Sequence, residues 1–196
     1  DKSYDLITKV GELGNYNGIG IGPGLGQDIA TQQGLYKFLK YNSIPLIIDA
    51  DALNILALHS DWLLLLPPKT IITPHLKELE RLNGKWNSEA ELFEKTIAFS
   101  KKHQLIVVMK GAPTYIVYGE LVYQNTTGNA ALATAGSGDV LAGMILGLLA
   151  QNMDATLASA AAVWMHGQAA QNFGPGLIAE DLPDCLPEVW RNLLVE

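Results

Sequence analysis

Four short apolar runs divide the chain, and a segment with helical spacing of apolar residues follows most of them. The runs are NGIGI at residues 17–21, IPLIID at 44–49, KTIIT at 69–73 and LIVVMK at 105–110. Runs that stay apolar instead of alternating with polar residues are typical of strands buried on both faces of a parallel sheet. The sequence therefore predicts an α/β fold, with a mostly parallel sheet and helices on both of its faces.

The segments between these runs predict the helices. Residues 27–41 carry Leu35, Phe38 and Leu39 at helical spacing. Ser88, with Glu91 three positions later, has the pattern of a capping box for a helix that ends near residue 103. Further helices are predicted at residues 52–58, after Pro74 as far as 82, at 139–150 and at 155–173. The stretches TYIVY and ELVYQ, joined by two residues, predict a β-hairpin.

Glycine-rich or polar segments follow the carboxyl ends of the predicted strands. These segments are GPGLG at residues 22–26, DADALN at 49–54, TPHLKE at 73–78 and KGAPT at 110–114. In open α/β sheets ligands bind beyond the carboxyl ends of the strands. We therefore expect the four segments, together with the start of the helix after TAGSGD, to meet at one edge of a single domain.

Composition and charge exclude several classes of partner. The 196 residues have a net charge of −7, so the basic patches that nucleic acids and anionic membranes require are not expected. Cys185 is the only cysteine, which rules out an intrachain disulfide framework and favours a cytoplasmic location. The longest uninterrupted apolar run, residues 140–150, is too short to span a bilayer.

The segment TAGSGD at residues 134–139 carries the strongest chemical signal. Gly136 and Gly138 allow a ligand to approach the backbone closely, and the N–H groups at a helix start bind anions. Asp139 lies at the edge of this anion site, where it can take a proton from an alcohol as that alcohol attacks a phosphoryl group. Capping of the helix by Asp139 is the simpler alternative, but it leaves the two glycines unexplained.

Two further segments can belong to a phosphate site. The GPGLG segment can bind a phosphate or lie beneath a ring, although this motif alone favours the simpler interpretation of a tight strand-to-helix turn. Lys110 at the end of a strand can meet phosphate oxygens, with Thr114 opening the next strand, and the alternative is a solvated lysine at a turn.

Acidic and imidazole side chains follow two other strands. Asp49 and Asp51 can hold Mg²⁺ through water, although one of them can instead cap the next helix. His75 can bind a ligand or cap a helix. His166, inside an alanine-rich predicted helix, is interpreted as a packed or surface residue and not as a catalyst.

The five motifs GPGLG, IIDADALN, ITPHLKE, KGAPT and GNAALATAGSGDVLAG, in this order, resemble those of the ATP- or ADP-dependent NAD(P)H-hydrate dehydratases. The resemblance covers nearly the whole chain from Gly18 onward. That family is a branch of the ribokinase-like superfamily. The resemblance therefore implies a ribokinase-like three-layer sandwich over residues 1–196, and an enzyme that repairs hydrated NADH and NADPH with an adenine nucleotide and Mg²⁺.

The resemblance also implies a role for each motif residue. Asp139 would activate the hydroxyl group of the hydrated nicotinamide ring. This hydroxyl oxygen would attack the terminal phosphate of the nucleotide, and the resulting phosphate ester would then lose phosphate. The anion hole would consist of Gly136, Ser137 and Gly138. The adenine nucleotide would lie against Lys110, Gly111, Ala112, Pro113 and Thr114, with Gly138 touching it. The hydrated dinucleotide would contact Gly24, His75 and Asp139. Either ADP or ATP would serve, and a homo-oligomer is implied.

The chain departs from the family pattern at two places. Its GNAALATAG run replaces a GNPGMATGG-like run, and Ala135 adds a methyl group beside the anion hole. No counterpart of the family's glycine- and alanine-rich N-terminal portion precedes Gly18. We therefore expect this single domain to lack its N-terminal portion.

Two other functions fit the same residues. A small-molecule hydroxyl kinase of the same superfamily would use the same aspartate and stop at the phosphorylated product. A non-catalytic nucleotide-binding subunit would keep the fold without turnover, although the intact residues Gly136, Gly138 and Asp139 weigh against it.

Overall fold

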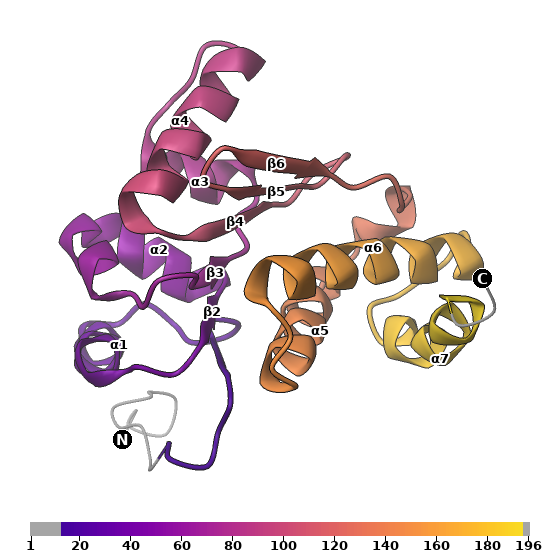
Figure 1. Ribbon diagram of the computed structural model, residues 1–196, viewed down its shortest axis with the longest axis horizontal. Coiled ribbons are helices and arrows are strands. Elements are labelled where there is room, and N and C mark those ends of the chain that lie inside the picture. Colours follow the sequence, from indigo (N-terminus) through magenta and orange to yellow (C-terminus); the bar gives the residue numbers. More distant parts are fainter. Residues whose placement is uncertain (1–12, 194–196) are drawn as a thin grey trace.

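A computed structural model describes residues 13–193 and shows a six-stranded sheet with its strands in sequence order (Figure 1). The first four strands are parallel: β1 (Ile19–Ile21), β2 (Leu46–Ile48), β3 (Ile71–Ile72) and β4 (Ile106–Met109). The antiparallel hairpin of β5 (Tyr115–Tyr118) and β6 (Leu121–Gln124) completes the sheet. The predicted α/β fold, its mostly parallel sheet and its hairpin are confirmed.

Seven α-helices and two 3₁₀ helices lie within the described part of the chain. They are α1 (Ile29–Tyr41), α2 (Ala50–Leu58), η2 (Ser60–Leu65), α3 (Leu76–Asn83), α4 (Glu89–His103), η3 (Ala130–Leu132), α5 (Ser137–Ala150), α6 (Ala155–Phe173) and α7 (Asp181–Leu193). None of these helices is long and apolar enough to cross a membrane.

Successive residues of each parallel strand point to opposite faces of the sheet and fill two separate cores. Ile48 and Ile72 pack in one core with residues of α1 to α4. Their neighbours Ile47 and Ile71 pack in a second core with α5 and α6. Figure 1 shows the sheet between these two helix layers, with α7 packed beside α6. Burial on both faces is the reason that the strands have no polar alternation.

Three helix starts differ from the sequence prediction, and the first of these helices, α1, begins at Ile29 and not at residue 27. The helix α2 begins at Ala50 because the Asp49 carboxylate caps it by accepting a hydrogen bond from the Ala50 N–H at 2.9 Å. The helix α5 begins at Ser137, two residues earlier than predicted, because Gly136 takes the left-handed conformation that starts the helix. Asp139 therefore lies within the first turn of α5 and not at its boundary.

The capping pattern at α4 is only partly as predicted. The Ser88 hydroxyl oxygen accepts a hydrogen bond from the Glu91 N–H at 3.2 Å, as expected. The Glu91 carboxylate, however, accepts a bond from the Asn87 N–H at 2.7 Å, one residue before the cap. The complete capping box of this fold lies at α3, where His75 and Glu78 exchange both bonds.

Candidate active site

An ion pair joins two strand ends at the start of α5. The Lys110 ammonium, just after β4, lies 2.8 Å from Asp49 Oδ1, just after β2. Asp49 is 2% exposed and Lys110 is 21% exposed, so both charges are largely shielded from water. A Cβ atom on Gly138 would lie 3.4 Å from Lys110 Nζ and 4.0 Å from Asp49 Oδ2. The predicted lysine, aspartate and glycine are therefore neighbours, although they lie far apart in the sequence.

The backbone of the anion hole is open to an acceptor. Gly136 is the residue before α5, with a φ of +85°, and no side chain caps the helix there. The Val140 N–H makes the first intrahelical bond, to Gly136 O at 3.0 Å. The N–H groups of Gly138 and Asp139 precede it and, as at any helix start, have no acceptor within the helix. An anion placed there would receive these bonds and the positive end of the helix dipole.

Asp139 is an exposed carboxylate in the first turn of α5. Gly136 occupies the N-cap position of α5, three residues before Asp139. Asp139 therefore does not cap this helix, which was the simpler alternative. Its exposure leaves the carboxylate accessible to a substrate hydroxyl group. The catalytic role of Asp139 stays a prediction.

The KGAPT segment is held to the sheet at both ends, and at its second end the Asn125 N–H, just after β6, donates to Thr114 O at 2.9 Å. The Lys110 N–H donates to Pro74 O at 2.8 Å, which extends the pairing of β3 and β4 beyond their ends. The Thr114 hydroxyl donates to Gly111 O at 3.0 Å. The residues between, Ala112 and Pro113, are exposed. The segment is thus held at its ends and exposed between them, which suits the binding of a nucleotide. Its binding role stays a prediction.

The GPGLG segment is shaped by contacts with the residues after β2. Gly22 has a φ of +137°, and a Cβ atom there would lie 1.8 Å from Asp49 O, so only glycine fits. The Asp51 carboxylate accepts hydrogen bonds from the Gly26 N–H at 2.9 Å and from Gln27 Nε2 at 2.8 Å. Gly24, the predicted substrate contact, has a φ of +64°, and a Cβ atom there would have nothing within 4 Å. The need for glycine at Gly22 arises from the backbone of Asp49, which is distant along the chain, so the sequence alone did not indicate it.

His75 caps a helix, which was one of its two predicted roles. Its Nδ1 atom accepts a hydrogen bond from the Glu78 N–H at 3.2 Å, and its Nε2 atom lies 3.5 Å from Glu78 Oε2. The His75 side chain is half exposed and pairs through its backbone with Lys110. The backbone of His75 therefore lies beside that of Lys110, and contact of the imidazole with substrate stays a prediction.

The carboxylates of Asp49 and Asp51 turn toward different partners. Asp49 Oδ1 accepts bonds from Lys110 and from the Ala50 N–H, whereas Asp51 accepts bonds from Gly26 and from Gln27, the residue after the GPGLG segment. Ala50 between them has a φ of +48°, in the left-handed region that favours glycine. No group of three or more metal-ligating side chains occurs within residues 13–193. This donor set fits a magnesium ion carried mainly by phosphate oxygens, with Asp49 Oδ2 as a protein contact, and does not form a dedicated cage.

His166 lies closer to the anion hole than the sequence indicated. It is 6% exposed on α6, and its Nε2 atom lies 3.0 Å from Ser137 O, in the first turn of α5. Burial lowers the pKa of His166 to about 4, so the imidazole is neutral near pH 7. The prediction of a packed histidine is confirmed, but the contact with the anion hole required the tertiary structure.

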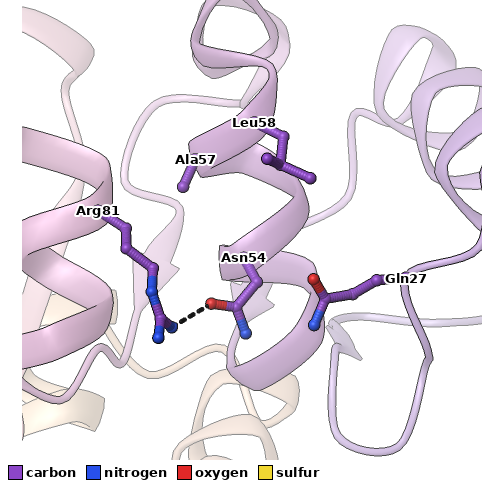
Figure 2. A pocket seen from close by; sticks show the side chains of 5 residues that line it. All are labelled: Gln27, Asn54, Ala57, Leu58 and Arg81. Carbon is purple, nitrogen blue, oxygen red and sulfur yellow. Dashed lines mark hydrogen bonds between the residues drawn. The ribbon is translucent and has the colours of Figure 1, made fainter.

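A cavity of about 590 Å³ opens beside the GPGLG segment (Figure 2). It is lined by Gln27, Asn54, Ala57, Leu58 and Arg81. Arg81 on α3 reaches toward α2, where its Nη1 atom donates to Asn54 Oδ1 at 2.7 Å. The cavity is thus polar at one end, with a guanidinium group on its wall. None of these five residues was predicted as a site residue.

Comparison with known proteins gives consistent matches. A family model for NAD(P)H-hydrate dehydratases matches residues 4–187. The bifunctional NAD(P)H-hydrate repair enzyme of Moorella thermoacetica is 39% identical over 183 residues, which cover 89% of this chain and 34% of that enzyme. The ADP-dependent (S)-NAD(P)H-hydrate dehydratase of Bacillus subtilis is 36% identical over 190 residues, which cover 90% of this chain and 64% of that enzyme. The chain thus spans about a third of the first relative and less than two thirds of the second.

Solved structures agree with the sequence matches. The Bacillus subtilis ADP/ATP-dependent NAD(P)H-hydrate dehydratase, co-crystallised with ATP/Mg²⁺ and soaked with CoA, has a TM-score of 0.73 at 33% identity, over 90% of this chain and 66% of that chain. A ribokinase from Thermotoga maritima has a TM-score of 0.59 at 16% identity, over 87% of this chain and 57% of that chain. At that identity the likeness concerns the fold alone, which is ribokinase-like.

Proposed function

The chain belongs to the NAD(P)H-hydrate dehydratase family, and we propose that it restores NADH and NADPH from their hydrates with the help of an adenine nucleotide. The observation that carries this proposal is the grouping of Lys110, Gly138 and Asp49 at the helix start that bears Asp139. A cation, free N–H groups and an accessible carboxylate together match the needs of phosphoryl transfer to an alcohol.

The first proposed step is phosphorylation of the ring hydroxyl group. Asp139 accepts the hydroxyl proton while the oxygen attacks the terminal phosphorus atom, and the bond from that phosphorus to the rest of the nucleotide breaks. The N–H groups of Gly138 and Asp139 stabilise the negative charge on the transferred phosphoryl group. Lys110 lies on the same side of the helix start and adds a positive charge.

The second proposed step is elimination of phosphate. Phosphate is a far better leaving group than hydroxide, and the lone pair of the ring nitrogen expels it as the carbon–oxygen bond breaks. Loss of a proton from the adjacent ring carbon then restores the dihydropyridine. The same anion hole holds the departing phosphate, so no second site is needed for this step.

The nucleotide is proposed to lie along the KGAPT segment, residues 110–114, with its terminal phosphate at Gly138. The relative from Bacillus subtilis is named ADP-dependent, and its crystals contain ATP/Mg²⁺. We propose the same nucleotide class here, with ADP or ATP open. Mg²⁺, when bound with the nucleotide, would neutralise phosphate charge, and Asp49 Oδ2 is its proposed protein contact.

The cavity beside the GPGLG segment is proposed to hold the part of the hydrated dinucleotide that lies away from the reacting ring. Arg81 on its wall offers a guanidinium group to a pyrophosphate, and Gly24 lies in the adjoining segment. An Arg81→Ala change is expected to raise KM for hydrated NADH while leaving kcat nearly unchanged. An unchanged KM would remove this cavity from the substrate site.

The direct test is an incubation of the chain with hydrated NADH, Mg²⁺ and either ADP or ATP. Recovery of the near-ultraviolet absorbance of reduced nicotinamide, dependent on nucleotide, would support the proposal and identify the nucleotide. Absorbance that stays flat with both nucleotides would overturn it for this chain. A longer chain containing the rest of the family's domain is the matched comparison, because this chain spans only part of its relatives.

A small-molecule hydroxyl kinase is the alternative that shares the same residues. Its product would keep the phosphate, so analysis for a stable phosphate ester separates the two activities. A homo-oligomeric state and a cytoplasmic location remain predictions, and sedimentation would test the first.

A further inference from the structure

We infer that His166 is a positioning residue for the anion hole, because its imidazole fixes the peptide group that carries the Gly138 N–H. This inference rests on the proposed function, in which that N–H binds the transferred phosphoryl group. No sequence pattern connects His166 with Gly138, since 28 positions separate them and no motif contains both.

One buried hydrogen bond, from His166 to Ser137 O, affects the neighbouring N–H of Gly138. His166 Nε2 lies 3.0 Å from Ser137 O. Ser137 C=O and Gly138 N–H belong to the same planar peptide group, in which the two bonds point in opposite directions. Holding the carbonyl oxygen therefore fixes the direction of the N–H. The hydrogen bond also polarises the peptide group, which makes the N–H a stronger donor.

The hydrogen must lie on the histidine. A carbonyl oxygen is only an acceptor, so Nε2 carries the hydrogen and donates it to Ser137 O. Ser137 is 5% exposed and His166 is 6% exposed, so water does not readily replace either partner. Loss of the imidazole would remove this second bond at Ser137 O, beside the bond that the α-helix itself provides, and would weaken and loosen the Gly138 N–H at the helix start.

The helix that carries His166 is itself held against the loop at residues 125–129, between β6 and η3. A Cβ atom on the next residue, Gly167, would lie 2.2 Å from Thr127 Oγ1, so α6 packs directly against that loop. The Thr127 hydroxyl donates to Trp164 O at 2.8 Å, and Asn129 Nδ2 donates to Ala170 O at 2.9 Å. These contacts hold α6 close to the loop and thereby help to place the imidazole.

The test compares three variants of the full chain. His166→Leu removes the donor, whereas His166→Gln keeps an N–H donor at the end of a side chain of similar reach. Ser159→Ala is the matched control, because the buried Ser159 hydroxyl donates to Ala155 O in the same helix. Thermal unfolding of each variant shows whether it is folded at the assay temperature.

We expect His166→Leu to lower kcat by roughly 10-fold, since a misdirected donor loses part of the contribution of an oxyanion-hole bond. KM for hydrated NADH should change by less than about twofold, because the donor acts mainly in the transition state. His166→Gln should recover most of the loss, and Ser159→Ala should match the unchanged chain. Equal kcat in His166→Leu, or equal losses in the Leu and Gln variants, would overturn the inference.

A second measurement does not depend on turnover. In ¹⁵N-labelled chain, addition of ADP should shift the Gly138 amide resonance, and His166→Leu should reduce that shift while shifts in the KGAPT segment persist. An undiminished Gly138 shift in that variant would also overturn the inference. If the unchanged chain fails to dehydrate hydrated NADH, the proposed function fails, and this amide measurement still decides the role of His166.

Discussion

Lys110 Nζ lies 2.8 Å from Asp49 Oδ1, and this contact joins the carboxyl end of β4 to that of β2 across the strand β3 between them. The Lys110 side chain is 21% exposed, and its ammonium lies beside the helix start at Gly138. The Lys110 ammonium therefore has two contacts: it neutralises the buried Asp49 carboxylate, and it lies at the anion hole.

Removal of Lys110 should affect both stability and binding. Lys110→Met leaves the Asp49 carboxylate buried without its cation, which should cost about 3 kcal/mol in the free energy of unfolding. ADP binding should weaken as well, because a positive charge leaves the phosphate site. Urea unfolding and calorimetric titration with ADP measure the two effects.

The matched control is Lys101→Met, since Lys101 pairs with Glu120 at 2.8 Å on the exposed surface. Solvent and salt screen such a pair, so its loss should not shift the unfolding midpoint measurably. Similar losses in the two variants would contradict the special place of the Lys110 pair.

Asp139→Ala should abolish most of the chemistry and spare nucleotide binding. Loss of the proposed base should raise the barrier by ~3–5 kcal/mol, which corresponds to a fall in kcat of roughly 10² to 10⁴. Glu89→Ala removes another exposed acid from a first helical turn and should leave kcat unchanged. Equal activity in Asp139→Ala would remove Asp139 from the mechanism.

Gly136→Ala should distort the anion hole. The φ of +85° disfavours any side chain, and the new Cβ would lie 3.1 Å from the Ala179 Cβ. We expect a loss of about 1–2 kcal/mol in the free energy of unfolding together with a fall in kcat. Gly147→Ala, in the same helix with nothing within 4 Å of its Cβ position, should instead stabilise by about 0.5–1 kcal/mol. Matching effects at the two glycines would contradict the strain at Gly136.

Ala50→Gly should stabilise the fold. Ala50 has a φ of +48°, where an alanine is disfavoured by roughly 1 kcal/mol, and a glycine relieves that strain. Ala57→Gly, further along the same helix, should destabilise by a similar amount because it only weakens the helix. Denaturant unfolding of the two variants should give changes of opposite sign, and losses in both would show that Ala50 is not strained.

His166 should make stability depend on pH. Its pKa is lowered by burial from 6.5 to about 4, so the unfolded chain binds a proton that the folded chain does not. The neutral side chain's contribution is complete above the unfolded pKa and is lost as the pH falls from about 6.5 toward 4. The loss between about pH 7.5 and pH 5 should be about 2 kcal/mol. His166→Gln should lack this part of the slope, and an unchanged slope would contradict the burial of a neutral imidazole.

The site was only partly predictable. The residues at the strand ends follow from local patterns, and the structure brings Lys110, Asp49, Gly138 and Asp139 to one edge. Lys110 as the partner of Asp49, 61 positions away, followed from no local pattern. Asp49 and Asp51 were predicted to hold Mg²⁺ or, for one of them, to cap a helix; Asp49 caps α2, the two carboxylates bond different partners, and the metal role stays a prediction.

The α/β fold, the succession of strands and helices along the chain and the motifs after the strands were predictable from local patterns, because continuous apolar runs and helical spacing are local properties that burial imposes on each segment. Which side chains meet was not predictable from such patterns. The His166 contact with Ser137 O and the close approach of Gly22 to Asp49 O depend on how deeply helices and loops pack against each other. Such contacts join residues that are distant along the chain, so no local pattern in the sequence specifies them.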